Sequence, residues 1–334
     1  DAMGEMEGVY NKGTVKGTGT ASQQIGGVAG YAKGAMINVY NTGAVSGVTF
    51  VGGVAGKTEE YLTNVYNTGD VTGTGDSVGG VAGDAAGDMD DVYNKGTVKG
   101  TGIASQQIGG VVGQVSSDHA RLLAVYNTGA VSGTGDYVGG VVGQVSSDDA
   151  RLLAVYNTGA VTGVGTSVGG VDGKACKLED AVYSDGSAAF AVGGQADSAF
   201  TNVSKHTEAE MKQADTYAKW IRFDRSWRIY DGYTTPLLKA FLTKVTVSGT
   251  GLATPVYDGQ AHTVSAADLS YSSTVDSSKV WKATQKNAGR YSLADMLYSS
   301  QDGYDFTSTD VYTITPKTIT AALTGSVTKT YDGT

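Results

Sequence analysis

Charged side chains that could contact a ligand fall in two nearly identical segments of this 334-residue chain, residues 114–124 and 144–154. Each segment carries acidic residues and an arginine at matching places, and the six candidates are Asp118, His119, Arg121, Asp148, Asp149 and Arg151. Such residues can bind a polar ligand through ion pairs and charge-assisted hydrogen bonds. The alternative is that the Leu-Leu pair after each arginine covers a core while the charges are merely solvated.

A second candidate is a set of tyrosines, one in each copy of a recurring Val-Tyr-Asn or Val-Tyr-Ser string. Its members are Tyr10, Tyr40, Tyr66, Tyr93, Tyr126, Tyr156 and Tyr183. If they line up on a surface, their rings could stack against sugars. An aligned row of tyrosines would equally pack against itself and stabilise the fold, which is the simpler interpretation.

Motifs for catalysis, metals and nucleotides are poorly developed. The run Gly73–Gly79 resembles a phosphate-binding glycine pattern, but no helix is predicted after it to present its N-terminus to a phosphate. Two acidic runs could help to bind calcium, namely Asp88, Asp90 and Asp91 and the pair Asp148 and Asp149. However, neither an EF-hand spacing nor a Gly-Gly-X-Gly-X-Asp repeat is present. The histidines lie far apart in sequence, and no repeat unit departs from the pattern to build a unique pocket. We therefore predict no enzyme activity and no cofactor, with calcium left open.

Composition narrows the class of protein. The chain has 50 glycines but only 3 prolines, and the glycines do not follow a period of three, so it is not collagen. Its single cysteine, Cys176, excludes an intrachain disulfide. The net charge of −9 comes from the acidic residues of 1–186, which disfavours nucleic acid and anionic lipid as partners. No apolar run approaches the length of a membrane span.

An internal repeat predicts the elements that position these residues. Each unit of roughly 30 residues reads V-Y-N-x-G-x-V-x-G and then V-G-G-V-x-G, which indicates short strands cut by glycine corners. One unit cannot bury its valines alone, so successive units must stack. We predict a mostly β protein whose residues 1–200 form a parallel β-solenoid of about seven coils. Aligned asparagines should form a hydrogen-bonded ladder, and they are Asn11, Asn41, Asn67, Asn94, Asn127 and Asn157.

The pattern changes twice after the solenoid. Residues 201–244 are predicted to cap its end: Thr207 and Glu210 form a capping-box signature, and apolar residues at helical spacing predict a helix over about 207–219. An aromatic cluster follows and would cover the exposed edge of the solenoid. Residues 245–316 predict a small β-sandwich-like or β-grasp-like domain. Residues 317–334 predict the start of a second copy, because a Tyr-Asp-Gly string recurs there.

These patterns resemble modules of large bacterial surface proteins. Over about residues 8–195, the unit resembles the GLUG repeat of filamentous-haemagglutinin-like adhesins and of some IgA-protease ectodomains. The run from Phe223 to Leu238 resembles the segment that closes such arrays. The later Tyr-Asp-Gly strings resemble the YDG/MBG repeats of adhesins, including those of two-partner secretion systems.

The resemblance implies an exported protein at the bacterial cell surface that attaches to host cells, matrix or other bacteria. Its partner would be a surface glycan or protein, bound without nucleic acid or membrane insertion, and the piece itself would be monomeric. Because residues 1–6 match residues 84–89 inside a later unit, we expect a secretion signal and domain upstream. Two alternatives remain, a purely structural spacer and an accessory ectodomain of a surface protease of the IgA-protease type.

Overall fold

The computed structural model describes residues 1–19, 22–102, 106–146, 149–174, 177–220, 223–322, 324–325 and 330–333. The chain forms two compact units: Asp1–Leu242 with Ser300–Gly303, and Thr243–Ser299 with Tyr304–Thr334. Among the described residues, no helix is long and apolar enough to cross a membrane. Cys176 lies outside the described residues.

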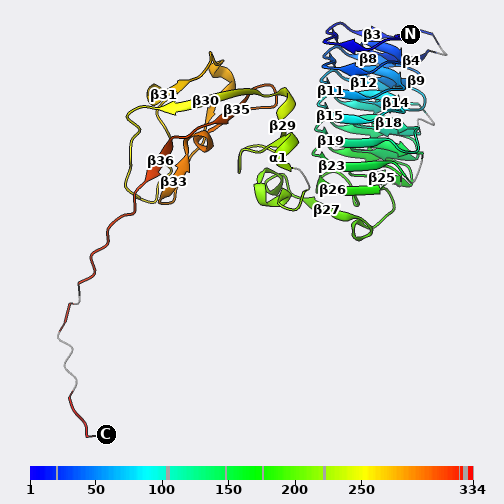
Figure 1. The fold of residues 1–334 in the computed structure, drawn as a ribbon. Coiled ribbons are helices and arrows are strands. Elements are labelled where there is room, and N and C mark those ends of the chain that lie inside the picture. The colour runs from blue at the N-terminus through cyan, green and yellow to red at the C-terminus, as the bar shows by residue number, and fades with distance from the viewer. Residues whose placement is uncertain are drawn as a thin grey trace. The chain divides into compact units, whose positions relative to one another are not determined.

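The first unit is a parallel β-solenoid with four sheets, into which successive coils place one strand after another (Figure 1). The sheet that carries the Val-Tyr-Asn strings, called the tyrosine sheet below, consists of β1 (Met6–Glu7), β2 (Tyr10–Asn11), β6 (Met36–Ile37), β7 (Tyr40–Asn41), β11 (Leu62–Asn67), β15 (Met89–Asn94), β19 (Arg121–Asn127), β23 (Arg151–Asn157), β26 (Lys177–Ser184) and β27 (Thr201–His206).

The other three sheets complete each coil. The second consists of β3 (Val15–Lys16), β8 (Val45–Gly47), β12 (Val71–Gly73), β16 (Val98–Gly100), β20 (Val131–Gly133) and β24 (Val161–Gly163). The third consists of β4 (Gln23–Gly26), β9 (Thr49–Gly52), β13 (Val78–Gly79), β17 (Gln107–Gly109), β21 (Tyr137–Gly139) and β25 (Ser167–Gly169). The fourth consists of β5 (Ala29–Ala32), β10 (Ala55–Thr58), β14 (Ala82–Ala85), β18 (Val112–Val115) and β22 (Val142–Val145).

The predicted parallel β-solenoid is confirmed, with about six full coils rather than seven. In the described part of the chain, the seventh unit adds β26 to the tyrosine sheet. Beside the fourth sheet it contributes only an isolated bridge from Val192 to Asp172 of the sixth unit. In this unit Ala188 and Phe190 stand where earlier units have the valine and glycine of V-x-G, and Gln195 stands where they have the last valine of V-G-G-V.

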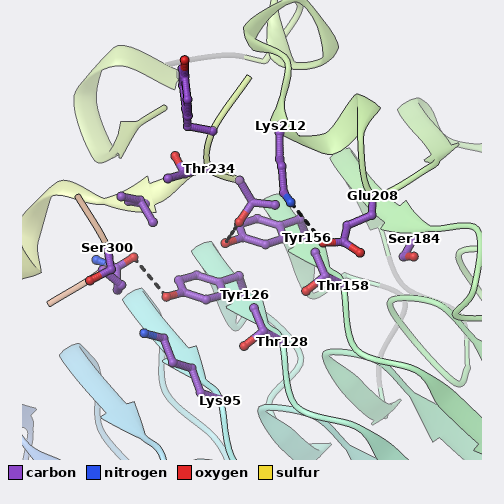
Figure 2. A pocket seen from close by; sticks show the side chains of 14 residues that line it. Lys95, Tyr126, Thr128, Tyr156, Thr158, Ser184, Glu208, Lys212, Thr234 and Ser300 are labelled. Carbon is purple, nitrogen blue, oxygen red and sulfur yellow. Dashed lines mark hydrogen bonds and ion pairs between the residues drawn. The ribbon is translucent and has the colours of Figure 1, made fainter. Parts of the chain in front are cut away.

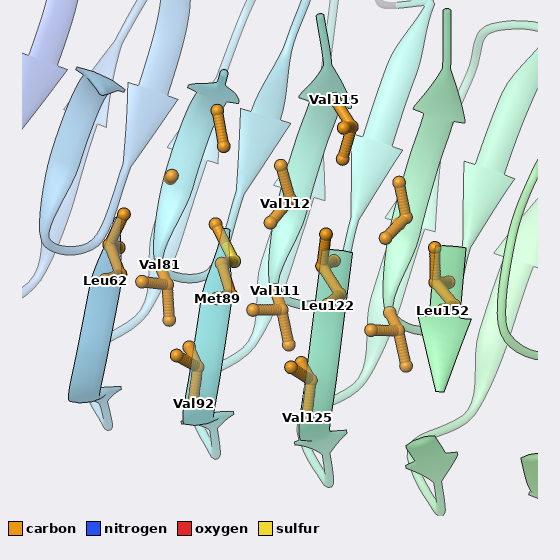
Figure 3. Packing of buried hydrophobic residues seen from close by; sticks show 14 of the residues in the cluster. Leu62, Val81, Met89, Val92, Val111, Val112, Val115, Leu122, Val125 and Leu152 are labelled. Atoms are coloured by element: carbon orange, nitrogen blue, oxygen red, sulfur yellow. The ribbon is translucent and has the colours of Figure 1, made fainter. Parts of the chain in front are cut away.

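Equivalent apolar side chains stack in files inside the coils (Figure 3). Leu62, Met89, Leu122 and Leu152 pair in register from coil to coil and are fully or almost fully buried. This packing explains the repeat, because each coil buries its apolar residues against the same residues of its neighbours.

The asparagine ladder is confirmed and lies beside close backbone contacts. Asn67 Nδ2 donates to Asn94 Oδ1 at 2.8 Å and to the Gly69 carbonyl at 2.7 Å. A Cβ atom at Gly53 would collide with the Gly80 carbonyl oxygen and the Asn67 side chain. Glycine is therefore required at this corner to let successive coils approach.

Tyr183 does not belong to the tyrosine file, so that prediction is wrong. Val182 pairs with Tyr156, which places Tyr183 in register with Asn157. Tyr183 is consequently fully buried, and Ser187 Oγ replaces the missing asparagine by accepting from Asn157 Nδ2 at 2.9 Å. Burial of Leu178 against Leu152 sets this register, because a one-residue slip would turn Leu178 toward solvent.

The predicted helix over about 207–219 is also wrong. The chain forms two 3₁₀ turns there, η2 (Glu210–Lys212) and η3 (Ala214–Tyr217), interrupted at Gln213 with φ −95° and ψ 132°. The Ala214 amide donates to Asp231 Oδ1 at 2.8 Å and the Gly232 amide donates to the Lys212 carbonyl at 2.7 Å. These bonds to residues 231–232 replace the helical ones. Ile221, part of the predicted pattern, lies outside the described residues.

The predicted capping box does form. The Thr207 amide donates to Glu210 Oε2 at 2.8 Å, and the Glu210 amide donates to Thr207 Oγ1 at 3.2 Å. Residues 207–242, called the aromatic segment below, continue with α1 (Phe223–Ser226), β28 (Trp227–Arg228), β29 (Leu237–Leu238) and η4 (Lys239–Phe241). Another 3₁₀ turn, η1 (Asp197–Ala199), precedes β27.

The aromatic segment packs against the face of the tyrosine sheet. Met211, Trp220, Trp227 and Leu238 share one buried cluster with the solenoid residues Tyr93, Leu123, Tyr126, Tyr156 and Val182. At the end of the sheet, β27 pairs with β26. The segment therefore covers the solenoid from the side, and the last edge of the sheet is extended by β27.

The second unit is a small β domain. Its strand β30 (Thr243–Gly249) pairs antiparallel with β31 (Leu269–Tyr271) and parallel with β35 (Tyr304–Thr307). Two further antiparallel pairs join β32 (Trp281–Lys282) to β34 (Leu297–Tyr298) and β33 (Gly289–Ser292) to β36 (Val311–Ile314). Short 3₁₀ turns lie between them, and they are η5 (Ala266–Asp268), η6 (Ser277–Lys279) and η7 (Leu293–Met296). The described residues after 316 carry neither strand nor helix.

Candidate functional site

The structure brings together four of the six charged candidates. His119, Arg121, Asp149 and Arg151 line an open depression of about 620 Å³. Asp88, which was considered only for calcium, and Lys177, which was not a candidate, line it as well. We call these six residues the loop face. Asp118 is exposed and does not line the depression, and Asp148 lies outside the described residues.

Strand register explains why the cations of the loop face meet. Arg121 pairs with Arg151, and Arg151 pairs with Lys177, so the three basic residues begin three successive strands. Adjacent strands lie about 4.8 Å apart. The sequence signal for Lys177 was its place before Leu178, which matches the Arg-Leu order of the two preceding coils.

Two acidic residues partly compensate this row of cations. The Arg121 amide donates to Asp88 Oδ1 at 2.8 Å, and Lys177 Nζ contacts Asp149 Oδ1 at 2.6 Å. The hydrogen bond and the positive charge of Lys177 lower the pKa of Asp149. Leu122 and Leu152 are fully buried, so the expectation that leucines after the arginines cover a core holds for these two.

The tyrosine file packs mainly against itself. Six rings, from Tyr10 to Tyr156, stack with centroids 4.8–5.0 Å apart and are nearly parallel. Phe241 and Trp227 cover its later members, whereas Tyr10 is exposed. Burial raises the pKa of Tyr126 well above its usual value, so this phenol does not titrate near neutral pH. The rings of the later tyrosines are therefore buried in packing contacts, whereas Tyr10 at the start of the file is exposed.

The acidic run before the tyrosine of the fourth coil lies near the aromatic segment. Asp91 Oδ1 is buried without a hydrogen-bond partner in the described part of the chain. Burial and the charge of Asp90 raise the pKa of Asp91 to about 7, and Arg225 partly offsets this. Among the described residues, no group of three or more His, Cys, Asp or Glu is arranged to hold a metal ion.

One arrangement has the residue types of a hydrolytic triad. His206 Nε2 lies 2.9 Å from Ser204 Oγ, and His206 Nδ1 lies 3.6 Å from Glu210 Oε2. The second distance is too long for a hydrogen bond. The same Glu210 oxygen also accepts both the amide and the hydroxyl of Thr207. Glu210 therefore acts as a capping group in this structure.

Sequence reasoning missed a pocket beneath the aromatic segment (Figure 2). We call this cavity of about 480 Å³ the hydroxyl pocket, and it lies entirely within the first unit. Its lining residues are Lys95, Tyr126, Thr128, Tyr156, Thr158, Ser184, Glu208, Lys212, Tyr233, Thr234, Thr235, Leu237, Ser300 and Gln301. The only sequence signal was the residue after each ladder asparagine, because Lys95, Thr128 and Thr158 occupy this place.

Buried hydrogen bonds hold the pocket together. The Tyr126 hydroxyl donates to Gln301 Oε1 at 3.0 Å, and the Leu238 amide donates to the same oxygen at 2.7 Å. The Tyr156 hydroxyl donates to the Pro236 carbonyl at 2.7 Å. These bonds fix the aromatic segment to the tyrosine sheet.

The fold and the two sites define a β-solenoid repeat protein with an aromatic segment packed on one sheet. No protein-family model matches the chain, and no curated protein matches it. The chain is similar to the crystal structure of a Bacteroides ovatus protein provisionally named an immunoglobulin A1 protease. The TM-score is 0.50 at 19% sequence identity, over 69% of this chain and 75% of that one. At this identity the likeness concerns the fold alone.

Proposed function

We propose that the chain is a non-catalytic binding module of an exported bacterial surface protein, and that the loop face attaches it to a surface glycan or protein. The observation that carries the proposal is the in-register row of Arg121, Arg151 and Lys177. Like charges on adjacent strands destabilise a sheet. Within the described residues, neither arginine side chain forms an ion pair, so both remain available to an acidic partner.

The rest of the solenoid surface varies less between coils than the loop face does, which favours the loop face as the binding site. Its strand residues are nearly the same from coil to coil, because each must fit the same stacking pattern. Insertions in solenoid coils lie on one face, which often binds ligands. The two longest insertions of this chain carry His119, Arg121, Asp149 and Arg151.

A glycan array tests the proposal. We expect the wild-type chain to bind acidic glycans and the variant with Arg121→Ala and Arg151→Ala to lose about tenfold or more in affinity, because each lost charged contact contributes about 1.5–3 kcal/mol. The control carries Lys16→Ala and Lys99→Ala, which removes the same charge from exposed positions in the second sheet. Equal binding by both double variants and the wild type would contradict a site on the loop face.

The name of the Bacteroides ovatus protein favours a second candidate, an accessory ectodomain of a surface protease. Immobilised immunoglobulin A1, included beside the glycans, separates the two. If the chain is retained by the immunoglobulin but by no glycan, the result favours the accessory ectodomain of a protease. Binding to neither leaves a structural spacer.

A further inference from the structure

The hydroxyl pocket presents a row of polar side chains on successive coils. Figure 2 shows Lys95, Thr128, Thr158 and Ser184 following one another along the cavity, with the Glu208 and Lys212 pair of the aromatic segment beside Thr158 and Ser184. Thr128 and Thr158 each lie two residues after a file tyrosine, so they face the same side of the sheet as those rings. The row is therefore rigid and repeats at the strand spacing.

The threonine hydroxyls of this row are available to a ligand. Within the described residues, neither the Thr128 nor the Thr158 side chain makes a hydrogen bond, although the backbone amides of both donate to the preceding coil. A hydroxyl group offers one donor and two acceptor positions. Two of them one coil apart suit a ligand that itself carries several hydroxyl groups.

Lys95 adds a positive charge that the protein neutralises only in part. Its Nζ forms no ion pair with a carboxylate of the described chain, and lies 5.3 Å from the centre of the Tyr93 ring. Desolvation lowers the pKa of Lys95, and the negative charge of Asp302 only partly opposes this. Lys212, by contrast, pairs with Glu208 at 3.1 Å. An anionic group beside Lys95 would restore the favourable environment of its charge.

We propose that the hydroxyl pocket is a second binding site, separate from the loop face, that takes an acidic sugar carrying a carboxylate or a sulfate. The cavity volume of about 480 Å³ lies within the usual range for small-molecule sites. Thr128 and Thr158 bind the sugar hydroxyls and Lys95 binds the anionic group. The site lies about 20 Å from the loop face, since Arg121 and Asn127 begin and end the same strand.

Calorimetric titration of the whole chain tests this site with four probes: glucuronic acid, galactose 6-sulfate, galactose and inorganic phosphate. We expect the preferred acidic sugar to bind at least about tenfold more tightly than galactose or phosphate. A preference between glucuronic acid and the sulfated sugar identifies the anionic group. Phosphate binding as tight as that of both acidic sugars would reduce the site to a simple anion site and overturn the proposal.

The repeat itself supplies matched variants. Lys95→Thr introduces the residue that four other coils carry at this position, so the fold should tolerate it. We expect it to weaken acidic-sugar binding about tenfold. Lys12→Thr makes the same change in the first coil, outside the pocket, and should leave binding within about twofold of wild type.

Two further variants keep the result decisive. Thr128→Val with Thr158→Val removes the hydroxyl row and should weaken every sugar probe, whereas Thr42→Val with Thr68→Val should not. The proposal would be overturned if neither acidic sugar showed saturable binding. It would also be overturned if Lys12→Thr and Lys95→Thr lost the same affinity for the acidic sugars. The loop-face double variant should bind these probes normally, so failure of that face and failure of this pocket are distinguishable.

Discussion

Asp91 offers a sharp test of how the coils are packed. It adopts a left-handed conformation with φ 55°, which other coils repeat at the equivalent residues Asn38 and Asn64. Asparagine is well suited to this conformation. Asn64 Nδ2 donates to Asn38 Oδ1 at 3.0 Å, whereas the buried Oδ1 of Asp91 has no partner among the described residues. Replacing Asp91 by Asn should therefore fit the backbone and remove a poorly solvated charge.

The size of the expected stabilisation by Asp91→Asn follows from the pKa of Asp91, which burial and the charge of Asp90 raise from 3.8 to about 7. The folded state then holds this proton more tightly than the unfolded state. The contribution of Asp91 therefore lowers the unfolding free energy as pH rises from about 4 to about 7, and is constant above that. A shift of about three pKa units corresponds to about 4 kcal/mol, which partial solvent exposure reduces, so we expect Asp91→Asn to stabilise the chain by about 2–4 kcal/mol at pH 8.

Urea unfolding at pH 4 and pH 8 measures this effect, with tryptophan fluorescence reporting on Trp220 and Trp227 of the same buried cluster. The gain of Asp91→Asn over wild type should be close to zero at pH 4. Asp136→Asn, which removes the same charge from an exposed turn, should give no comparable gain at either pH. An equal gain of Asp91→Asn at both pH values, or no gain at pH 8, would refute the reasoning.

Two predictions test the stacking itself. Asn127→Ala removes four hydrogen bonds of the buried ladder and should lower the unfolding free energy by about 3 kcal/mol. The control Asn11→Ala, in the more exposed first coil, should lower it by less than about 1 kcal/mol. Similar losses for the two variants in urea titrations would contradict a buried ladder. Deleting Gln114–Gly143 joins equivalent positions of two coils and should leave a folded chain by circular dichroism. Deleting 207–238 should instead uncover the tyrosine sheet and cause aggregation visible by light scattering, and the reverse pattern would count against the solenoid packing.

The repeat strings alone determined the solenoid, the asparagine ladder and the tyrosine stack from Tyr10 to Tyr156. The physical reason is that identical units bury the same residues against each other, so a side chain's place in one coil predicts its place in the next. The same logic brought His119, Arg121, Asp149 and Arg151 to one face.

Tertiary structure decided the features that depend on contacts between unlike segments. Burial of Leu178 shifted the last Val-Tyr string by one residue and turned Tyr183 into the core. Bonds to residues 231–232 broke the expected helix into two turns. The hydroxyl pocket exists only because the aromatic segment folds back over Thr128 and Thr158. No periodicity in the sequence encodes such a contact, since its two partners share neither a repeat nor a register.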